Sequence, residues 1–204
     1  MPLVAITPDR VDVDLSLAYA TAVNFTGQPI YAEADCYLHA DAAALLDRAT
    51  GLAAALGYRF RIFDAFRPSE AQWAMWRHTP DPVFLSDPRC GSPHSRGVAV
   101  DLTLVDTAGR TLDMGTGFDA FTPLSHHGND AIPPSAQRNR ALLLGIMTAA
   151  GWDCYLKEWW HYQLFEPRRY PLLSDSVLPR PMMTAPTART TGTAGRLAAP
   201  TGER

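Results

Sequence analysis

Two separate segments of the chain contain residues that could together hold a catalytic metal ion. One reads Ser92-Pro93-His94-Ser95-Arg96-Gly97-Val98-Ala99-Val100-Asp101, and the other reads Glu158-Trp159-Trp160-His161. Together they supply two imidazoles, one carboxylate ligand and a further glutamate. A catalytic zinc centre needs three protein ligands, an open position for water and a base beside it. We therefore expect hydrolytic chemistry, because a binding protein has no obvious use for the further glutamate.

The first segment needs a turn to bring its two candidate ligands together. His94 and Asp101 are seven residues apart, so in a fully extended strand they would face opposite ways. Gly97 can supply the unusual dihedral angles of a turn between them. Asp101 lies in an apolar run, where a carboxylate is costly unless it is paired or bound to a metal. Taken alone, the segment also fits a loop histidine beside a buried, hydrogen-bonded aspartate.

The second segment also needs a break in the backbone. Glu158 and His161 are three residues apart and would face opposite ways on a strand, unless the chain kinks at Trp159-Trp160. The alternative is a surface glutamate and a histidine packed on an aromatic wall. The presence of both segments in one short chain favours the metal site. Cys90 is not expected to be a ligand, because it lacks a second thiolate at ligand spacing.

Hydrophobic periodicity predicts alternating helices and strands around these segments. Apolar residues at helical spacing predict helices, strict alternation predicts strands, and four prolines mark a loop over 79–93. Ser69 and Gln72 resemble a capping box at the start of a short helix. The expected elements are helices at 41–56, 69–78 and 135–150, strands at 58–66, 97–105 and 152–165, and an irregular arm at 14–38.

Length and composition favour one globular domain. The 204 residues suffice for one well-buried core, which we place at 1–178, and the Thr/Ala/Pro/Gly-rich stretch 179–204 is predicted to be a disordered tail. The net charge of −3 without a basic stripe argues against nucleic acid as a partner. No export signal or membrane span is evident, and three widely spaced cysteines suggest no disulfide framework, so a cytoplasmic location is expected. The oligomeric state stays open.

The metal-site motifs and several other segments together resemble one peptidase family. Ser92, His94, Gly97, Ala99 and Asp101, followed by Glu158, Trp160 and His161, are similar to the zinc D-Ala-D-Ala peptidases, specifically the VanX-type D-alanyl-D-alanine dipeptidases. Segments 19–27, 64–68, 114–119 and 125–127 resemble the same family in the same order. The resemblance spans roughly residues 17–170. The region 79–93 looks short, so the lip of the cleft is expected to differ.

This resemblance implies an α+β fold: a central, mainly antiparallel sheet flanked by helices, in one domain with the zinc site in a cleft. It implies one Zn²⁺ per chain, held by His94, Asp101 and His161, with Glu158 as the general base. It also implies that Arg67 faces the tetrahedral intermediate, where a fixed guanidinium would stabilise negative charge. Without the resemblance, Arg67 would be interpreted as a solvated arginine after a strand.

The same resemblance implies a small dipeptide as the substrate. It places Asp119 near the substrate ammonium, with Ser92 and Tyr19 as further polar contacts. From the sequence alone, Asp119 could equally be a turn residue. The expected reaction is hydrolysis of D-Ala-D-Ala. The alternatives are a D,D-carboxypeptidase or endopeptidase acting on peptidoglycan stem peptides and a non-catalytic zinc-binding module, although such a module should lose Glu158 or Arg67.

Overall fold

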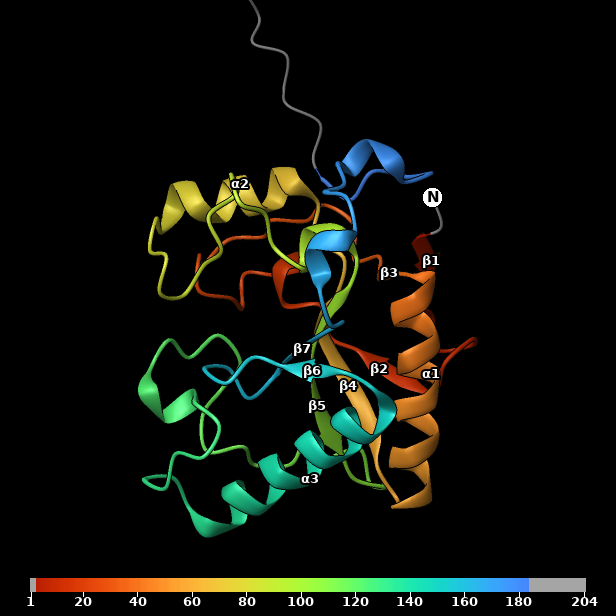
Figure 1. Cartoon of the computed structure of the whole chain (residues 1–204), viewed down its shortest axis with the longest axis vertical. Helices are drawn as coiled ribbons and strands as arrows, with labels where there is room; N and C mark the ends of the chain where they lie inside the picture. The colour runs from red at the N-terminus through yellow and green to blue at the C-terminus, as the bar shows by residue number, and fades with distance from the viewer. Residues whose placement is uncertain (1–2, 184–204) are drawn as a thin grey trace, which may run out of the picture.

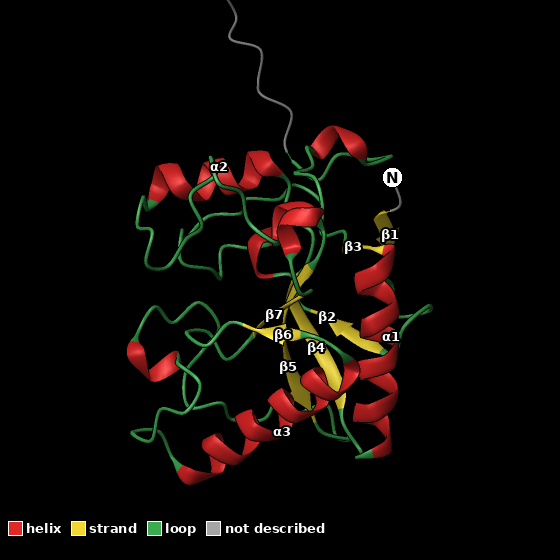
Figure 2. Cartoon of the chain, in the orientation of Figure 1, coloured by secondary structure: helices red, strands yellow, loops and turns green. Residues whose placement is uncertain are grey.

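A five-stranded mixed sheet, which carries Asp101 and His161, runs through the middle of the molecule (Figures 1 and 2). The computed structural model describes residues 3–183. Within this range the strand order is β2-β4-β5-β7-β6; β2 runs parallel to β4, and every other neighbouring pair is antiparallel. The expected α+β architecture with a mainly antiparallel sheet is confirmed. The strands are β2 (Val13–Leu15), β4 (Arg59–Asp64), β5 (Ala99–Val105), β6 (Asp153–Cys154) and β7 (His161–Gln163).

The described residues form three α-helices, and a second sheet pairs β1 (Leu3–Ala5) with β3 (Tyr37–His39). Helices α1 (Ala40–Ala55) and α3 (Pro134–Ala150) pack against each other; α1 contacts β4 and α3 contacts β6. Helix α2 (Ser69–His78) lies at the opposite end of the molecule from α3, at the top of Figure 1. The helices at 41–56 and 135–150 were therefore predicted to within one residue at each end.

Strand β5 is the central element, and all seven of its residues are buried. Its apolar positions enter the core from both faces, as expected for a strand covered on both sides. Asp101 is paired with His161 of β7 in the antiparallel register, and a shift in the register of β4 brings Asp64 opposite Asp101. The pairing of three strands thus gathers polar side chains from distant parts of the sequence inside the core.

The aromatic segment 152–165 is two short strands, so the prediction of one strand is wrong. The backbone turns between them: the Glu158 amide donates to the Tyr155 carbonyl, and the His161 amide donates to the Glu158 carbonyl. Cys154 then pairs with Tyr162 across an antiparallel hairpin. The kink expected between Glu158 and His161 is this turn.

The predicted capping box at the start of α2 is wrong as well. Pro68 is the N-cap residue and makes no side-chain bond to the helix. The Ser69 hydroxyl donates instead to the Leu173 carbonyl, and Gln72 is buried, where it bonds Arg67. Both side chains therefore make tertiary contacts and do not cap the helix.

The packed body continues past Leu178, where the tail was expected to start. Met182 is 1% exposed, and its amide donates to Asp175 Oδ1. The remainder of the predicted disordered tail, 184–204, lies outside the described residues, and the division of the chain at 178 stays a prediction. Within residues 3–183, no helix has the length and apolar character needed to span a membrane.

Candidate metal centre

Three buried side chains bring one ligand atom each to a common point. His161 Nδ1 lies 3.1 Å from Asp101 Oδ1 and 3.1 Å from His94 Nε2. His94 Nε2 and Asp101 Oδ1 are 3.3 Å apart, which completes a triangle of donor atoms. In the part of the chain that the structure describes, no other group of three or more His, Cys, Asp or Glu side chains converges in this way.

A tight turn delivers His94 to this triangle. Residues 94–96 form one turn of 3-10 helix, and the Ser92 hydroxyl accepts the His94 amide at 3.2 Å. Gly97 ends the turn at φ +70°, in the left-handed region that favours glycine. A Cβ there would come within 2.6 Å of the Leu3 side chain. The turn expected at Gly97 is therefore present, and it depends on this residue.

Hydrogen bonds to the outer ring nitrogens decide the tautomers of both histidines. His94 Nδ1 lies 2.7 Å from the Ala65 carbonyl, which can only accept, so Nδ1 carries the proton and Nε2 a lone pair. His161 Nε2 lies 3.1 Å from Gln163 Oε1, which leaves a lone pair on His161 Nδ1. Two imidazole lone pairs and a carboxylate oxygen therefore face one another.

This donor set fits a zinc ion. Lone pairs at about 3 Å repel one another unless a cation lies among them, and histidines that bind metals usually donate their other N–H to a neighbouring acceptor. Ligands about 2.0–2.1 Å from a tetrahedral zinc would be roughly 3.3–3.4 Å apart, close to the 3.1–3.3 Å observed here. Two nitrogens and one oxygen leave a fourth position open.

Gln163 orients His161, so its substitution should weaken zinc binding. We expect Gln163→Leu to lower zinc affinity by about 10–100-fold, because the acceptor that fixes the His161 tautomer is lost. Competition with a chromogenic chelator measures this affinity. Gln163→Glu keeps the acceptor and should bind zinc at least as tightly as the wild type; equal affinities for Gln163→Leu and the wild type would contradict this role.

Glu158 lies beside the triangle and lines the same cavity as its three members. Burial raises the pKa of its carboxyl to about 7, with His161 and Arg67 opposing the shift and Asp101 adding to it. A carboxyl that titrates near neutrality can both take up and release a proton at physiological pH. The turn of residues 155–161 holds Glu158 and His161 together.

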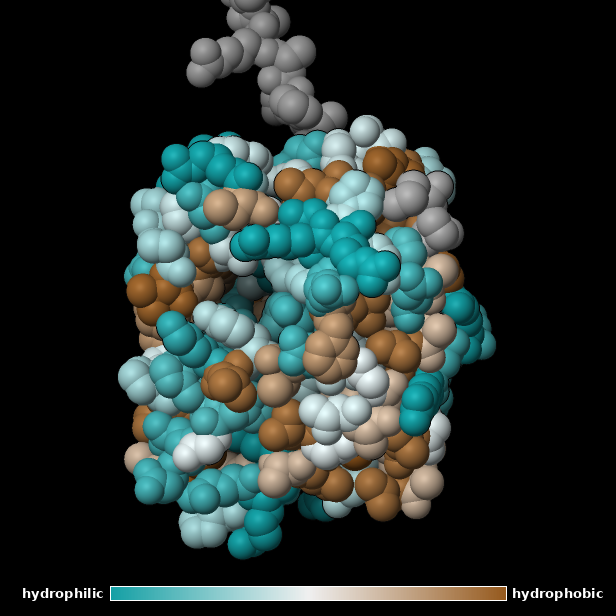
Figure 3. All heavy atoms as spheres, viewed as in Figure 1, coloured by the Kyte–Doolittle hydropathy of each residue, from teal (hydrophilic) through white to brown (hydrophobic). Residues whose placement is uncertain are grey.

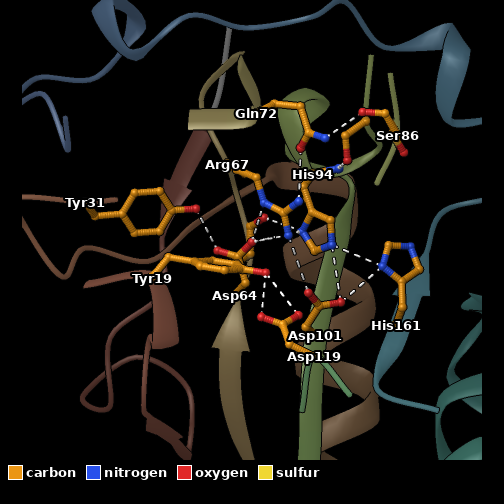
Figure 4. A network of polar contacts seen from close by, with 12 residues as sticks. Tyr19, Tyr31, Asp64, Arg67, Gln72, Ser86, His94, Asp101, Asp119 and His161 are labelled. Carbon is orange, nitrogen blue, oxygen red and sulfur yellow. Dashed lines mark hydrogen bonds and ion pairs between the residues drawn. The ribbon is translucent and has the colours of Figure 1, made fainter. Parts of the chain in front are cut away.

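Arg67 is held inside the protein by a fixed set of partners (Figure 4). Its side chain is 7% exposed; Nε donates to Asp64 Oδ2 at 2.9 Å, and Nη1 donates to Gln72 Oε1 at 3.0 Å. The guanidinium carbon lies 5.0 Å from the centre of the Tyr19 ring. Asp64 is supported in turn by the Tyr31 hydroxyl at 2.9 Å. Arg67 is therefore a positioned cation and not a solvated one.

Asp119 has a strained backbone and a shifted pKa. Its φ is +57°, in the left-handed region that residues other than glycine rarely adopt. The Tyr19 hydroxyl lies 3.1 Å from Oδ1 and 3.0 Å from Oδ2. Burial raises the pKa of Asp119 to about 8, and the charge of Asp101 adds to this shift. A cationic ligand at Asp119 would restore its charged form.

The shifted pKa predicts how Asp119 affects the stability of the metal-free protein. A carboxyl whose pKa is raised on folding stabilises the protein at low pH, and this contribution is lost as pH rises through about 8. We therefore expect Asp119→Asn to stabilise the metal-free protein relative to the wild type, and more at pH 8 than at pH 5. Urea unfolding of both proteins at several pH values tests this; a difference independent of pH would contradict it.

One cavity of about 290 Å³ brings these residues together. Its volume is near the lower end of the range for small-molecule sites, roughly 300–1,000 Å³. Figure 3 shows the surface hollowed beside the centre of the view. All eight residues singled out in the sequence line this cavity: Tyr19, Arg67, Ser92, His94, Asp101, Asp119, Glu158 and His161.

Sequence reasoning missed Arg140, which holds the segment that carries Asp119. Arg140 is 4% exposed and donates to three backbone carbonyls, those of Met114 at 2.7 Å, Leu124 at 2.8 Å and His126 at 3.1 Å. No local sequence pattern indicates that a helical arginine will donate to backbone carbonyls of a distant segment. His126 and His127 do not belong to the metal cluster.

The sheet, the donor triangle and the adjacent glutamate define a metal-dependent hydrolase. Residues 2–175 match peptidase family M15, described as D-Ala-D-Ala dipeptidase. The chain therefore belongs to this family of metallopeptidases.

Curated relatives support this assignment over most of the chain. A D-alanyl-D-alanine dipeptidase of Escherichia coli K12 is 46% identical over 164 residues, 80% of this chain and 85% of that protein. The proteins of the same name from Streptomyces coelicolor and Enterococcus faecalis are 36% and 34% identical, and each match covers 72% of this chain and 84% of the relative.

Proposed function

We propose that this protein is a zinc-dependent dipeptidase that hydrolyses D-Ala-D-Ala to two molecules of D-alanine. The observation that carries this proposal is the triangle of bare donor atoms on His94, Asp101 and His161, which lines one small cavity with Glu158 and Arg67. The family and the names of its curated members supply the substrate.

His94, Asp101 and His161 would hold the zinc ion, one per chain. When bound, zinc lowers the pKa of a water molecule toward neutrality and polarises the peptide carbonyl. The bare Nε2 of His94 and Nδ1 of His161 are ready to bind it, since their outer nitrogens already carry the protons.

Glu158 acts as the base and then as the acid. It takes a proton from the attacking water as the oxygen bonds to the carbonyl carbon, and it delivers that proton to the leaving nitrogen as the C–N bond breaks. In the metal-free protein the pKa of this carboxyl is raised to about 7, near the operating pH, which suits it to both tasks.

Arg67 stabilises the negative charge that develops on the carbonyl oxygen. Its guanidinium is already oriented by Asp64 and Gln72, so little reorganisation is needed when the charge appears. The bonds to Asp64 and Gln72 drawn in Figure 4 therefore fix a cation that lines the cavity.

Asp119, Tyr19 and Ser92 select the substrate. The Asp119 carboxylate, held by the Tyr19 hydroxyl, accepts the ammonium group of a free dipeptide. Ser92 lies on the cavity wall, where its hydroxyl proton is free to donate, because the oxygen accepts from the His94 amide. A site that pairs with the ammonium next to the scissile bond disfavours peptides that are extended at the N-terminus.

Hydrolysis of a small substrate panel tests the proposal. Zinc-loaded protein is incubated with D-Ala-D-Ala, L-Ala-L-Ala and a pentapeptide ending in D-Ala-D-Ala, and released alanine is measured. Preferred release from D-Ala-D-Ala is expected. Preferred cleavage of the pentapeptide would indicate a D,D-carboxypeptidase instead, and turnover no greater than that of Glu158→Ala would indicate a non-catalytic module.

A further inference from the structure

Four aromatic side chains from four separate segments form a continuous row beside the cavity. Phe25 lies 6.0 Å from His78 and 5.2 Å from Phe121, measured between ring centroids. Phe121 is stacked on Phe84, with centroids 4.9 Å apart and ring planes at 19°. We name these four residues the aromatic bridge.

The bridge joins two segments that line the cavity. Phe84 comes from the proline-rich loop after α2, and Phe121 comes from the segment that Arg140 holds. Both rings line the 290 Å³ cavity, and both also line a second, smaller hollow together with Ala120 and Thr122. The stacked rings therefore lie between the cavity and the space next to it.

The bridge lies at the Asp119 end of the cavity. Phe121 follows Asp119 by two residues, and Phe25 packs edge-on against Tyr19, with centroids 6.2 Å apart. Tyr19 in turn bonds both carboxylate oxygens of Asp119. Phe84 and Phe121 line the same cavity as Asp119, so both rings lie within the space in which a substrate held at Asp119 would extend.

We propose that the stacked pair Phe84 and Phe121 limits substrate length: it closes the cavity beyond Asp119 and excludes peptides extended at the N-terminus of D-Ala-D-Ala. This inference rests on the proposed function. An added N-terminal residue converts the ammonium into an uncharged amide, which removes the charge that Asp119 would accept. It also requires space that the two rings occupy. The charge of Asp119 and the bulk of the stack thus select against the same peptides independently.

Removal of either ring tests the inference through a ratio of two substrates. The rates kcat/KM for L-Lys-D-Ala-D-Ala and for D-Ala-D-Ala are compared in the wild type, Phe84→Ala and Phe121→Ala. We expect the tripeptide-to-dipeptide ratio to rise by at least about tenfold in each variant, the scale on which a pocket discriminates by size. Phe165→Ala is the matched control, because Phe165 is 64% exposed and does not line the cavity.

Binding provides a readout that does not depend on turnover. Both peptides are titrated into Glu158→Ala protein with and without Phe84→Ala, and isothermal titration calorimetry measures the two affinities. The same rise in the ratio of affinities is expected. If the wild type hydrolysed neither peptide, the proposed function would fail while this ratio still decided the inference.

An unchanged ratio in both variants, with native circular dichroism, would overturn the inference. Phe84→Leu covers the case in which alanine prevents folding, because leucine keeps apolar bulk while removing the stacked ring. A smaller rise in the ratio is expected for Phe84→Leu than for Phe84→Ala. A ratio equal to that of the wild type in a folded Phe84→Leu protein would count against the inference.

Discussion

Replacing Glu158 by glutamine is expected to lower kcat for D-Ala-D-Ala by about 10²–10⁴-fold, the usual contribution of a general acid or base. Glutamine has nearly the same shape but cannot take the proton of the attacking water or pass it to the leaving amine. Glu158 is not one of the three donor atoms of the metal triangle, so zinc binding should remain. D-alanine release and the zinc content of the same preparation measure both quantities.

Glu166→Gln is the matched control for this variant. Glu166 has an exposed side chain that pairs with Arg169 and does not line the cavity. Its substitution should leave kcat at the wild-type value. Retention of more than about a tenth of wild-type kcat by a zinc-loaded Glu158→Gln protein would fall short of the expected contribution and exclude Glu158 as the base.

Replacing Arg67 by methionine should damage both catalysis and stability. Loss of a donor to a developing oxyanion lowers kcat by about 10²–10³-fold. Removing one partner of a buried ion pair also costs about 3–5 kcal/mol of unfolding free energy, because the carboxyl of Asp64, 1% exposed, would lose the cation that compensates its burial. Urea unfolding and initial rates of hydrolysis measure the two effects separately.

A double variant separates the two roles of Arg67. Asp64→Asn in the Arg67→Met background removes the uncompensated charge, so much of the lost stability should return. The rate should stay low, because no cation faces the carbonyl oxygen. If kcat recovered together with stability, Arg67 would contribute to folding alone.

The elements were predictable where one hydrophobic period persists over many residues. The alternation of Val98, Val100, Leu102 and Leu104 predicts the strand that appears as β5, and the helical stripes predict α1 and α3. The segment 152–165 was harder, because its aromatic residues mask the turn between β6 and β7. That turn depends on backbone hydrogen bonds, such as the one from the Glu158 amide to the Tyr155 carbonyl. The residue types in the segment do not predict these bonds.

The sequence predicted those residues of the site that belong to recognisable motifs. The eight residues named from the sequence line one cavity, although their individual roles stay predictions. The supporting residues Tyr31, Gln72 and Arg140 were not found, because each acts through a contact across the fold. Tyr31 reaches Asp64 over 33 positions, and Arg140 reaches Met114 over 26. Such contacts follow from strand register and helix placement, which local patterns do not specify.

The most direct test of the central claim is a zinc titration of metal-free protein with D-alanine release as the readout. Chelator-treated protein should be inactive on D-Ala-D-Ala. Activity should return linearly with added zinc and reach a plateau at one zinc per chain, and Asp101→Ala should show no such return. Hydrolysis that persists in metal-free protein, or zinc-saturated protein that releases no D-alanine, would contradict the account.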